Sequence, residues 1–325
     1  MIIHINYIFS HMSEKYTIAF YNIENLFDTK DDEHTNDEDF LPTSVKRWTT
    51  KRYENKLRKL GQVISQIGED DIDSPPAIVG LAEVENNQVV KDLIDSKYLK
   101  HYKYDIVHYD SSDERGIDVA LIYNTDVFEV SHSEAYPVYL TKEDGSRDYT
   151  RNVLQVTGKL NDEQIHIIVN HWSSRRQGQK KTEYKRLAAA DTVNRIVKTL
   201  NKNYSNPKII VMGDFNDTPY NKSLLSLVTE SNLYNPFKKI STENKGSLNH
   251  NFQWHLFDQI LISTNFFDTK FTQFNLSEAK IFNSQFLTQY HGKFKGQPFR
   301  TYVGKRYKGG YSDHFPVYIE FKEDV

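Results

Sequence analysis

Ile209-Ile210-Val211-Met212-Gly213-Asp214-Phe215-Asn216 is an apolar run that ends abruptly in polar residues. A short run of β-branched and other apolar residues predicts a buried β-strand over Ile209–Gly213. Side chains alternate along a strand, so Asp214 and Asn216 are expected on one face, just beyond its end. Strand ends are where α/β proteins display their reactive groups. The segment therefore predicts a covered sheet with a polar site at its edge.

Segments of the same character occur on both sides of this run. Most of them are almost continuously apolar, which suits strands covered by helices on one face and by a second sheet on the other. Apolar residues at helical spacing predict helices through Leu57–Ile67 and Tyr184–Leu200. The other predicted strands are Tyr16–Asn22, Ala77–Val84, Val119–Tyr123, Val153–Gly158, His166–Asn170, Phe257–Ser263 and Pro316–Phe321.

The chain shows no internal repeat and no linker rich in Pro, Gly or Ser. We therefore expect a single domain over residues 15–325, preceded by an N-terminal extension, residues 1–14, outside the fold. Apolar residues make up 38% of the 325 residues and aromatic residues 13%, which is enough for a sizeable core. No feature predicts oligomerisation, so a monomer is expected.

Bulk properties exclude several kinds of function. The absence of cysteine excludes disulfides, thiolate zinc sites and cysteine nucleophiles. A net charge of −3 supplies no global field for a long polyanion, so local cations or a metal would have to hold any nucleic acid. No apolar run approaches the length of a membrane span, and no convincing signal peptide opens the chain. We therefore expect no stable membrane insertion and favour the cytoplasm.

The segment Asp28–Asp39 is strongly acidic, with Asp28, Asp31, Asp32, Glu33, Asp37, Glu38 and Asp39. It lacks the ligand order and the glycine of a calcium-binding loop. We interpret it as a solvated surface loop, which would repel a polyanion passing nearby.

Polar residues also end or follow the other predicted strands. They are Asn22 and Glu24, Glu83, Asn170 and His171, Asp258, and the pair Asp313 and His314. Carboxylate and amide oxygens suit a hard cation such as Mg²⁺ or Mn²⁺, which polarises a phosphoryl oxygen. A carboxylate can activate a water, and a histidine can donate a hydrogen bond where charge grows. No glycine-rich phosphate loop and no Ser-His-Asp elbow occurs, so these residues point to hydrolysis of phosphate esters.

In their order along the chain, the strand ends and the polar residues that follow them resemble the motifs of the endonuclease/exonuclease/phosphatase family, which includes the DNase I-like nucleases. The resemblance spans residues 21 to 316, and its most specific parts are Gly-Asp-Phe-Asn and Ser-Asp-His-x-Pro. The matching segments are Tyr21–Asn25, Leu81–Val84, Arg115–Val119, Asn170–Ser173, Gly213–Asn216, Phe257–Ile260 and Ser312–Pro316. The resemblance implies a four-layered α/β/β/α sandwich.

The resemblance also implies roles for individual residues. Glu83 would be the principal metal ligand, Asn22 and Asp313 would complete or support the site, and Glu24 would lie beside it. The ion would be Mg²⁺, with Mn²⁺ or Ca²⁺ possible, and one ion or two is left open.

The remaining roles implied by the resemblance concern the attacking water molecule and the phosphate group of the substrate. Asp214 would orient or deprotonate the water, and Asn216 would hold the water or the phosphate. His314 would contact the phosphate, with Asp258 fixing its tautomer. His171 would steady the phosphate or the leaving oxygen, with Asn170 next to it.

Three arginines are further candidates for binding phosphate: Arg151, Arg175 and, with weaker support, Arg300. Arg175 lies in the basic stretch Trp172–Lys181, which we expect to open a helix.

Several functions remain open on the sequence alone. The leading alternative is a phosphodiesterase, with nuclease as the leading subclass and nucleic acid as a candidate substrate. A phosphomonoesterase or phospholipase could use the same site, and a lipid enzyme would need exposed apolar residues such as Phe266-Phe267 or Phe286-Leu287. A binding protein that has lost catalysis is the third alternative, but none of Glu83, Asp214 and His314 is missing.

Overall fold

Strand β10 (Lys208–Asp214) lies in the interior of a six-stranded sheet in the computed structural model, which describes residues 15–268, 270 and 272–323. It pairs in parallel with β9 (Glu163–His171) and antiparallel with β14 (Asp258–Ser263). All seven of its residues are buried, as expected of a strand covered on both faces. The order in this sheet is β11-β14-β10-β9-β8-β5.

A second six-stranded sheet has the order β15-β18-β1-β2-β4-β3. Its central pair, β1 (Lys15–Leu26) and β2 (Ile78–Val84), is parallel, and its other pairs are antiparallel. The remaining strands of the two sheets are β3 (Tyr104–His108), β4 (Asp118–Asn124), β5 (Phe128–Tyr136), β8 (Val153–Leu160), β11 (Leu233–Tyr234), β15 (Phe274–Ile281) and β18 (Val317–Glu323).

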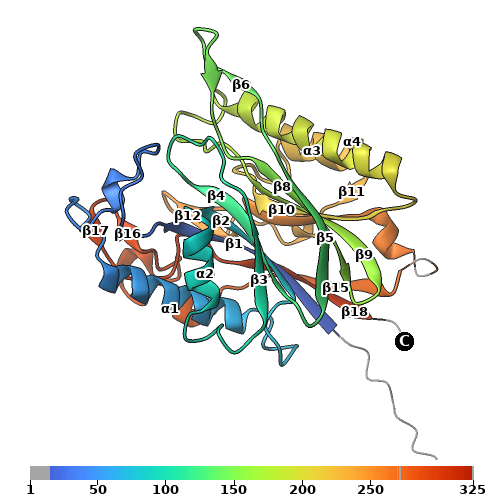
Figure 1. Cartoon of the computed structure of the whole chain (residues 1–325), viewed down its shortest axis with the longest axis horizontal. Helices are drawn as coiled ribbons and strands as arrows, with labels where there is room; N and C mark the ends of the chain where they lie inside the picture. Colours follow the sequence, from blue (N-terminus) through green and yellow to red (C-terminus); the bar gives the residue numbers. More distant parts are fainter. Residues whose placement is uncertain (1–14, 269, 271, 324–325) are drawn as a thin grey trace, which may run out of the picture.

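Helices cover the outer face of each sheet (Figure 1). Helices α1 (Thr50–Gln66) and α2 (Asn87–Ile94) pack on the sheet that contains β1, and α3 (Glu183–Asn203) and α4 (Lys222–Glu230) pack on the sheet that contains β10. Between the sheets, Ile210 and Met212 of β10 share one apolar core with residues of β1 and β2. The fold is therefore the expected α/β/β/α sandwich.

Two-stranded hairpins and 3₁₀ turns lie outside the two large sheets. The hairpins are β6 (Leu140–Thr141) with β7 (Arg147–Asp148), β12 (Leu248–His250) with β13 (Gln253–His255), and β16 (Tyr302–Val303) with β17 (Arg306–Tyr307). Single 3₁₀ turns lie at Glu38–Phe40, Pro236–Lys239, Thr264–Phe267, Gln285–Leu287 and Gly292–Phe294.

The eight predicted strands and both predicted helices are present. The prediction for the basic stretch was wrong in detail, because residues 172–182 form turns and α3 begins only at Glu183. Helices α2 and α4 were not predicted, since each is short. The expected N-terminal extension, residues 1–14, lies outside the described residues, and none of the described helices is long and apolar enough to cross a membrane.

Candidate active site

The carboxyl ends of β1, β2, β9 and β10 meet at one edge of the sandwich, because β1 pairs in parallel with β2 and β9 with β10 while the two sheets face each other. The backbone changes direction there. Glu24, Asn25, Glu83 and Asn216 adopt left-handed φ values of 52°, 51°, 66° and 48°. Such conformations are costly for residues other than glycine and cluster at functional sites. The bulges that contain Glu24 and Glu83 lift both carboxylates out of the strand ladder.

Asp214 occupies the centre of this edge. Its Oδ1 accepts the backbone N–H of Asn216 at 2.9 Å, and its Oδ2 accepts from Asn22 Nδ2 at 3.0 Å. The same Oδ2 lies 3.7 Å from His171 Nε2 and 3.9 Å from His314 Nε2. Burial and the neighbouring Asp258 raise the pKa of Asp214 to about 7. A carboxylate with a raised pKa between two histidines is suited to accept a proton.

His314 is paired with the fully buried Asp258. Its Nδ1 lies 2.7 Å from Asp258 Oδ2, which leaves Nε2 facing Asp214. Burial lowers the pKa of His314, but the Asp258, Asp214 and Asp313 carboxylates outweigh burial and hold that pKa well above its usual range. The ring is therefore a cation at neutral pH that can donate from Nε2.

His171 has the opposite electrostatic setting. Burial, with Arg151, Arg115, His314 and Arg176 nearby, holds the pKa of His171 well below its usual range. Its Nε2 lies 3.9 Å from Glu83 Oε1 and 3.7 Å from Asp214 Oδ2. The edge thus presents one neutral and one charged imidazole, which divides hydrogen-bonding roles between them.

Two of the four predicted metal ligands present accessible carboxylates. The side chains of Glu83 and Asp313 are 15% and 30% exposed, and both act electrostatically on Lys56 and Arg300. Asn25 N–H donates to Glu83 Oε2 at 2.9 Å, which leaves Oε1 free of a strong donor. Two oxygen ligands on a partly open surface fit a hard divalent cation that keeps several waters.

Asn22 and Glu24 are held behind these carboxylates. Asn22 donates to Glu83 at 3.4 Å and to Asp214 at 3.0 Å, and its Oδ1 accepts the Glu24 N–H. Glu24 accepts the backbone N–H groups of Thr301 and Tyr302. These contacts suit support of the metal site better than direct ligation.

The ligand atoms of Asp214, Asp258 and His314 also lie within 4.8 Å of one another. We interpret this group as an ion-paired histidine, because His314 Nδ1 lies at hydrogen-bond distance, 2.7 Å, from Asp258 Oδ2.

Cationic side chains line a pocket of about 220 Å³ beside His171. Arg151 donates to Asp113 at 3.0 Å and to the Trp172 carbonyl at 2.8 Å, while its buried Nε has no partner among the described residues. Arg115 donates to Asn25 Oδ1 at 2.6 Å. Arg176 is exposed and borders both this pocket and the pocket beside Glu24. The three guanidinium groups make this side of the site suited to an anion.

The other sequence candidates lie in structural networks. Arg175 pairs with Asp217 at 2.5 Å and donates to the carbonyl of Asn216 at 2.6 Å.

The two asparagines at the ends of β9 and β10 are also held by structural contacts. Asn170 accepts from the indole of Trp172 at 3.1 Å and donates to the carbonyl of Met212 at 3.3 Å. Asn216 donates to the Trp172 carbonyl at 3.0 Å. These contacts shape the loop that carries Asp214, and the role of Arg175 as a phosphate ligand stays a prediction without a supporting contact.

Sequence reasoning missed Arg115, Arg176 and Lys56 as members of this edge. Lys56 is fully buried on α1 and donates to Thr301 Oγ1 and to the Tyr311 carbonyl, both at 2.6 Å. A lysine within an otherwise apolar helix face was the available signal. For Arg176 the available signal was the basic stretch Trp172–Lys181, but that stretch does not distinguish Arg176 from its neighbour Arg175. Arg300, the weaker candidate, lies in the site and pairs with Asp313 at 2.5 Å.

Comparison with known proteins gives one family. The model of the endonuclease/exonuclease/phosphatase family matches residues 17–323. No curated protein matches the chain.

Solved structures of the same fold cover almost the whole chain. A family protein from Bacteroides thetaiotaomicron is 19% identical with a TM-score of 0.61, covering 97% of this chain and 100% of that one. The mannosyl-6-phosphatase Bt3783 of the same species is 19% identical with a TM-score of 0.57 over 94% and 99% of the two chains. The human Nocturnin catalytic domain, solved with a sulfate anion, is 15% identical with a TM-score of 0.55 over 96% and 98%. At these identities the likeness establishes the fold alone.

Proposed function

The chain belongs to the endonuclease/exonuclease/phosphatase family of phosphate-ester hydrolases, and we propose that it is a divalent-metal-dependent phosphodiesterase, with nuclease as the leading subclass. The observation that carries this proposal is the convergence of Asp214, His171 and His314 on one point, with Asp214 Oδ2 3.7 and 3.9 Å from the two imidazole Nε2 atoms. An anion-binding pocket and a pair of accessible carboxylates flank that point.

In the proposed reaction, Asp214 accepts a proton from a water that attacks phosphorus in line with the leaving oxygen. Asn22 and the Asn216 N–H hold the Asp214 carboxylate in position. His314, kept cationic by Asp258, donates from Nε2 to a phosphoryl oxygen where negative charge grows. Neutral His171 steadies the phosphate from the other side.

The same site has a place for a cation. Glu83 and Asp313 would hold it, with Asn22 and Glu24 in support, and Mg²⁺ is the ion we favour over Mn²⁺ or Ca²⁺. A divalent ion bound there would offset charge on the phosphoryl and leaving oxygens.

A panel of three substrates tests the proposal: plasmid DNA, bis-(p-nitrophenyl) phosphate and p-nitrophenyl phosphate, each with Mg²⁺, Mn²⁺, Ca²⁺ or EDTA. We expect EDTA-sensitive cleavage of the diesters, reduced about 10²–10⁴-fold in Asp214→Ala because the proton acceptor is removed. Lys202→Ala, at an exposed lysine near the end of α3, is the matched control and should match the wild type. No detectable hydrolysis of any of the three substrates, together with no bound metal, would contradict the proposal and favour a binding protein.

A phosphomonoesterase is the second candidate, and the arginine pocket favours it. Arg115, Arg151 and Arg176 supply more positive charge than a diester monoanion requires. Hydrolysis of p-nitrophenyl phosphate without cleavage of either diester would select this alternative. A phospholipase has weaker support, because Phe266 and Leu287 are buried, Phe286 is half-buried, and only Phe267 of the four candidate residues is exposed.

A further inference from the structure

The segment between Glu278 and Asp313 differs in charge from the rest of the chain. Residues 279–312 contain seven lysine or arginine residues and no aspartate or glutamate, although the whole chain carries a net charge of −3. The same segment contains eight aromatic residues. Basic residues interleaved with aromatic ones are the composition of surfaces that bind single-stranded nucleic acid.

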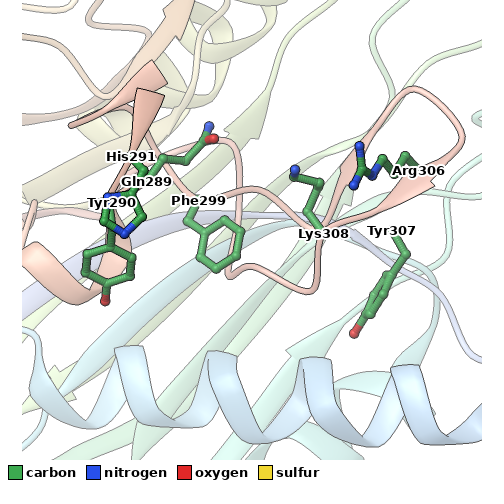
Figure 2. Close-up of a pocket in the computed structure, with 7 residues that line it drawn as sticks. All are labelled: Gln289, Tyr290, His291, Phe299, Arg306, Tyr307 and Lys308. Atoms are coloured by element: carbon green, nitrogen blue, oxygen red, sulfur yellow. The ribbon is translucent and has the colours of Figure 1, made fainter. Parts of the chain in front are cut away.

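Part of this segment encloses a pocket of about 350 Å³ (Figure 2). Figure 2 shows the rings of Tyr290, Phe299 and Tyr307 on one side of the pocket and the polar ends of Gln289, Arg306 and Lys308 on the other. A volume of this size accommodates a ligand as large as one nucleotide. The pocket therefore combines an aromatic floor with a cationic rim.

Two of the three rings, Phe299 and Tyr307, are held in place from below by α1. Arg52 lies over the Tyr307 ring at 4.3 Å, and Lys59 lies over the Phe299 ring at 5.3 Å. Asn55 donates to the Tyr307 hydroxyl at 3.1 Å. Rings fixed in this way lose little conformational freedom when a base stacks on them.

The cationic rim is available to a ligand. Arg306 and Lys308 are exposed, and so are Lys293, Lys295 and Lys305 nearby. None of these five side chains pairs with a carboxylate anywhere in residues 15–268, 270 and 272–323. Unpaired cations clustered on one surface attract the phosphates of a polyanion.

The pocket adjoins the candidate active site. Phe299 lines the pocket, and the next residue, Arg300, pairs with Asp313 of the site. Tyr307 of the pocket contacts Tyr302 edge to face at 5.3 Å, and Tyr302 lines the depression that holds Glu24. The segment Phe299–Tyr302 therefore contributes residues both to the pocket and to the surroundings of the site.

An acidic depression elsewhere on the described surface would repel such a chain. Asp28, Asp31, Asp32 and Glu33 gather there with Glu85, beside Lys30 and His34. Like charges disfavour a polyanion, so a strand that lies along residues 289–308 would avoid this depression.

We propose that the pocket formed by Gln289–His291, Phe299 and Arg306–Lys308 binds a nucleotide of a single-stranded nucleic acid whose neighbouring phosphate lies in the active site. A single strand is required because its bases are free to stack on protein rings, whereas the bases of a duplex are paired and stacked on one another. The proposal deepens the phosphodiesterase function and rests on it for the fate of the bound strand.

Binding is measured separately from hydrolysis. Fluorescence anisotropy of a labelled oligothymidylate about 12 nucleotides long, in EDTA, follows association of the whole protein with no cleavage. We expect Arg306→Ala/Lys308→Ala to weaken binding about tenfold or more and to make the dependence of log Kd on log salt shallower by about one to two. Tyr290→Ala, which removes a half-exposed ring, should weaken binding by at least about fivefold with little change in the salt dependence.

The matched control is Lys198→Ala/Lys202→Ala, which removes two exposed cations from α3 on the opposite sheet. It should bind like the wild type, and circular dichroism should show that every variant is folded. Equal affinities for the pocket and control variants would overturn the proposal. Tighter binding of a duplex of the same length would also overturn it. So would pocket variants that lose binding to phosphatidylserine vesicles but keep the wild-type affinity for the oligonucleotide.

Hydrolysis of bis-(p-nitrophenyl) phosphate by the wild type separates the two proposals. If the wild type cleaves it but the pocket variants bind the oligonucleotide normally, the pocket proposal fails and the proposed function stands. If the wild type hydrolyses none of the three phosphate-ester substrates, the proposed function fails, whether or not the protein binds the oligonucleotide.

Discussion

The two histidines of the candidate site show how single neighbours set a side chain's charge. Burial, with Arg115, Arg151 and Arg176 nearby, lowers the pKa of His171, whereas the Asp258, Asp214 and Asp313 carboxylates outweigh burial and raise the pKa of His314. Asp258 makes the shortest contact with His314, 2.7 Å, and its Oδ1 has no partner among the described residues. We therefore assign Asp258 a positioning role toward His314.

Replacing Asp258 by asparagine tests that role. Asp258→Asn removes the largest influence that raises the pKa of His314, so the imidazolium is lost at a lower pH than in the wild type. We expect the basic limb of the kcat/KM profile to move to lower pH and kcat at neutral pH to fall about 10²-fold or more. An unchanged basic limb would show that Asp258 does not act through His314.

His166 gives a second pH dependence that is independent of the active site. It is fully buried on β9 next to Thr157, and burial lowers the pKa of His166 to about 4. Between about pH 6.5 and pH 4 the unfolded chain binds a proton that the folded chain does not, so the free energy of unfolding falls as pH falls. The loss amounts to on the order of 3 kcal/mol. Urea unfolding at several pH values in this range should show that the free energy of unfolding depends less steeply on pH in His166→Asn than in the wild type. An identical dependence on pH would contradict the assignment.

Among the elements, β9 and β10 position most of the catalytic candidates. Gly213 allows the two strands to approach at the point where Asn170 and Asp214 leave the sheet. A Cβ at Gly213 would lie 2.3 Å from the Asn170 carbonyl oxygen and 2.7 Å from its Cβ. Backbone atoms cannot yield as a flexible side chain does, so the strands must separate.

Gly213→Ala should therefore affect both folding and chemistry. We expect the free energy of unfolding to fall by about 1–3 kcal/mol, from overpacking. We also expect kcat to fall because Asp214, the next residue, moves relative to His171. Gly145→Ala is the control for kcat: no atom lies within 4 Å of an added Cβ, and although its φ of +84° strains the β6–β7 turn, kcat should be unchanged. A variant with normal kcat would show that the β9–β10 spacing does not set the position of Asp214.

On the scale of the whole molecule, the site joins the two sheets. Asn22 and Glu83 come from one sheet, Asp214 and His171 from the other, and the Asn22–Asp214 hydrogen bond crosses between them. A cation held at this junction is bound by the folded chain and not by the unfolded one, so its binding free energy adds to stability.

Thermal unfolding should therefore report the metal. At a Mg²⁺ concentration about 100 times the Kd, the folded state gains about 2.7 kcal/mol, and the Tm rises. Glu83→Gln should lose most of this rise, whereas Glu230→Gln, at the exposed end of α4, should retain it. An equal rise in both variants would place the cation elsewhere.

The strands, and the residue types at their ends, could be predicted from the amino-acid sequence. Continuous apolar runs such as Ile209–Gly213 have few alternatives to a buried strand, and the polar residues that follow them must lie at a sheet edge. The order of the motifs then identified the family, and with it the sandwich. These inferences succeeded because each depends on local pattern, which packing rarely reverses.

The identity of the charged groups that face the site could not be predicted in the same way, because it depends on how the elements pack. Arg175 and Arg176 are adjacent in sequence, yet Arg175 turns to Asp217 and Arg176 borders both pockets, because a turn sends neighbouring side chains in different directions. Lys56 reaches the site from a helix about 245 residues from its partner Thr301. The aromatic floor beneath Arg306 and Lys308 likewise depends on α1. Such contacts arise from long-range packing of elements, and the spacing of residues along the chain does not encode them.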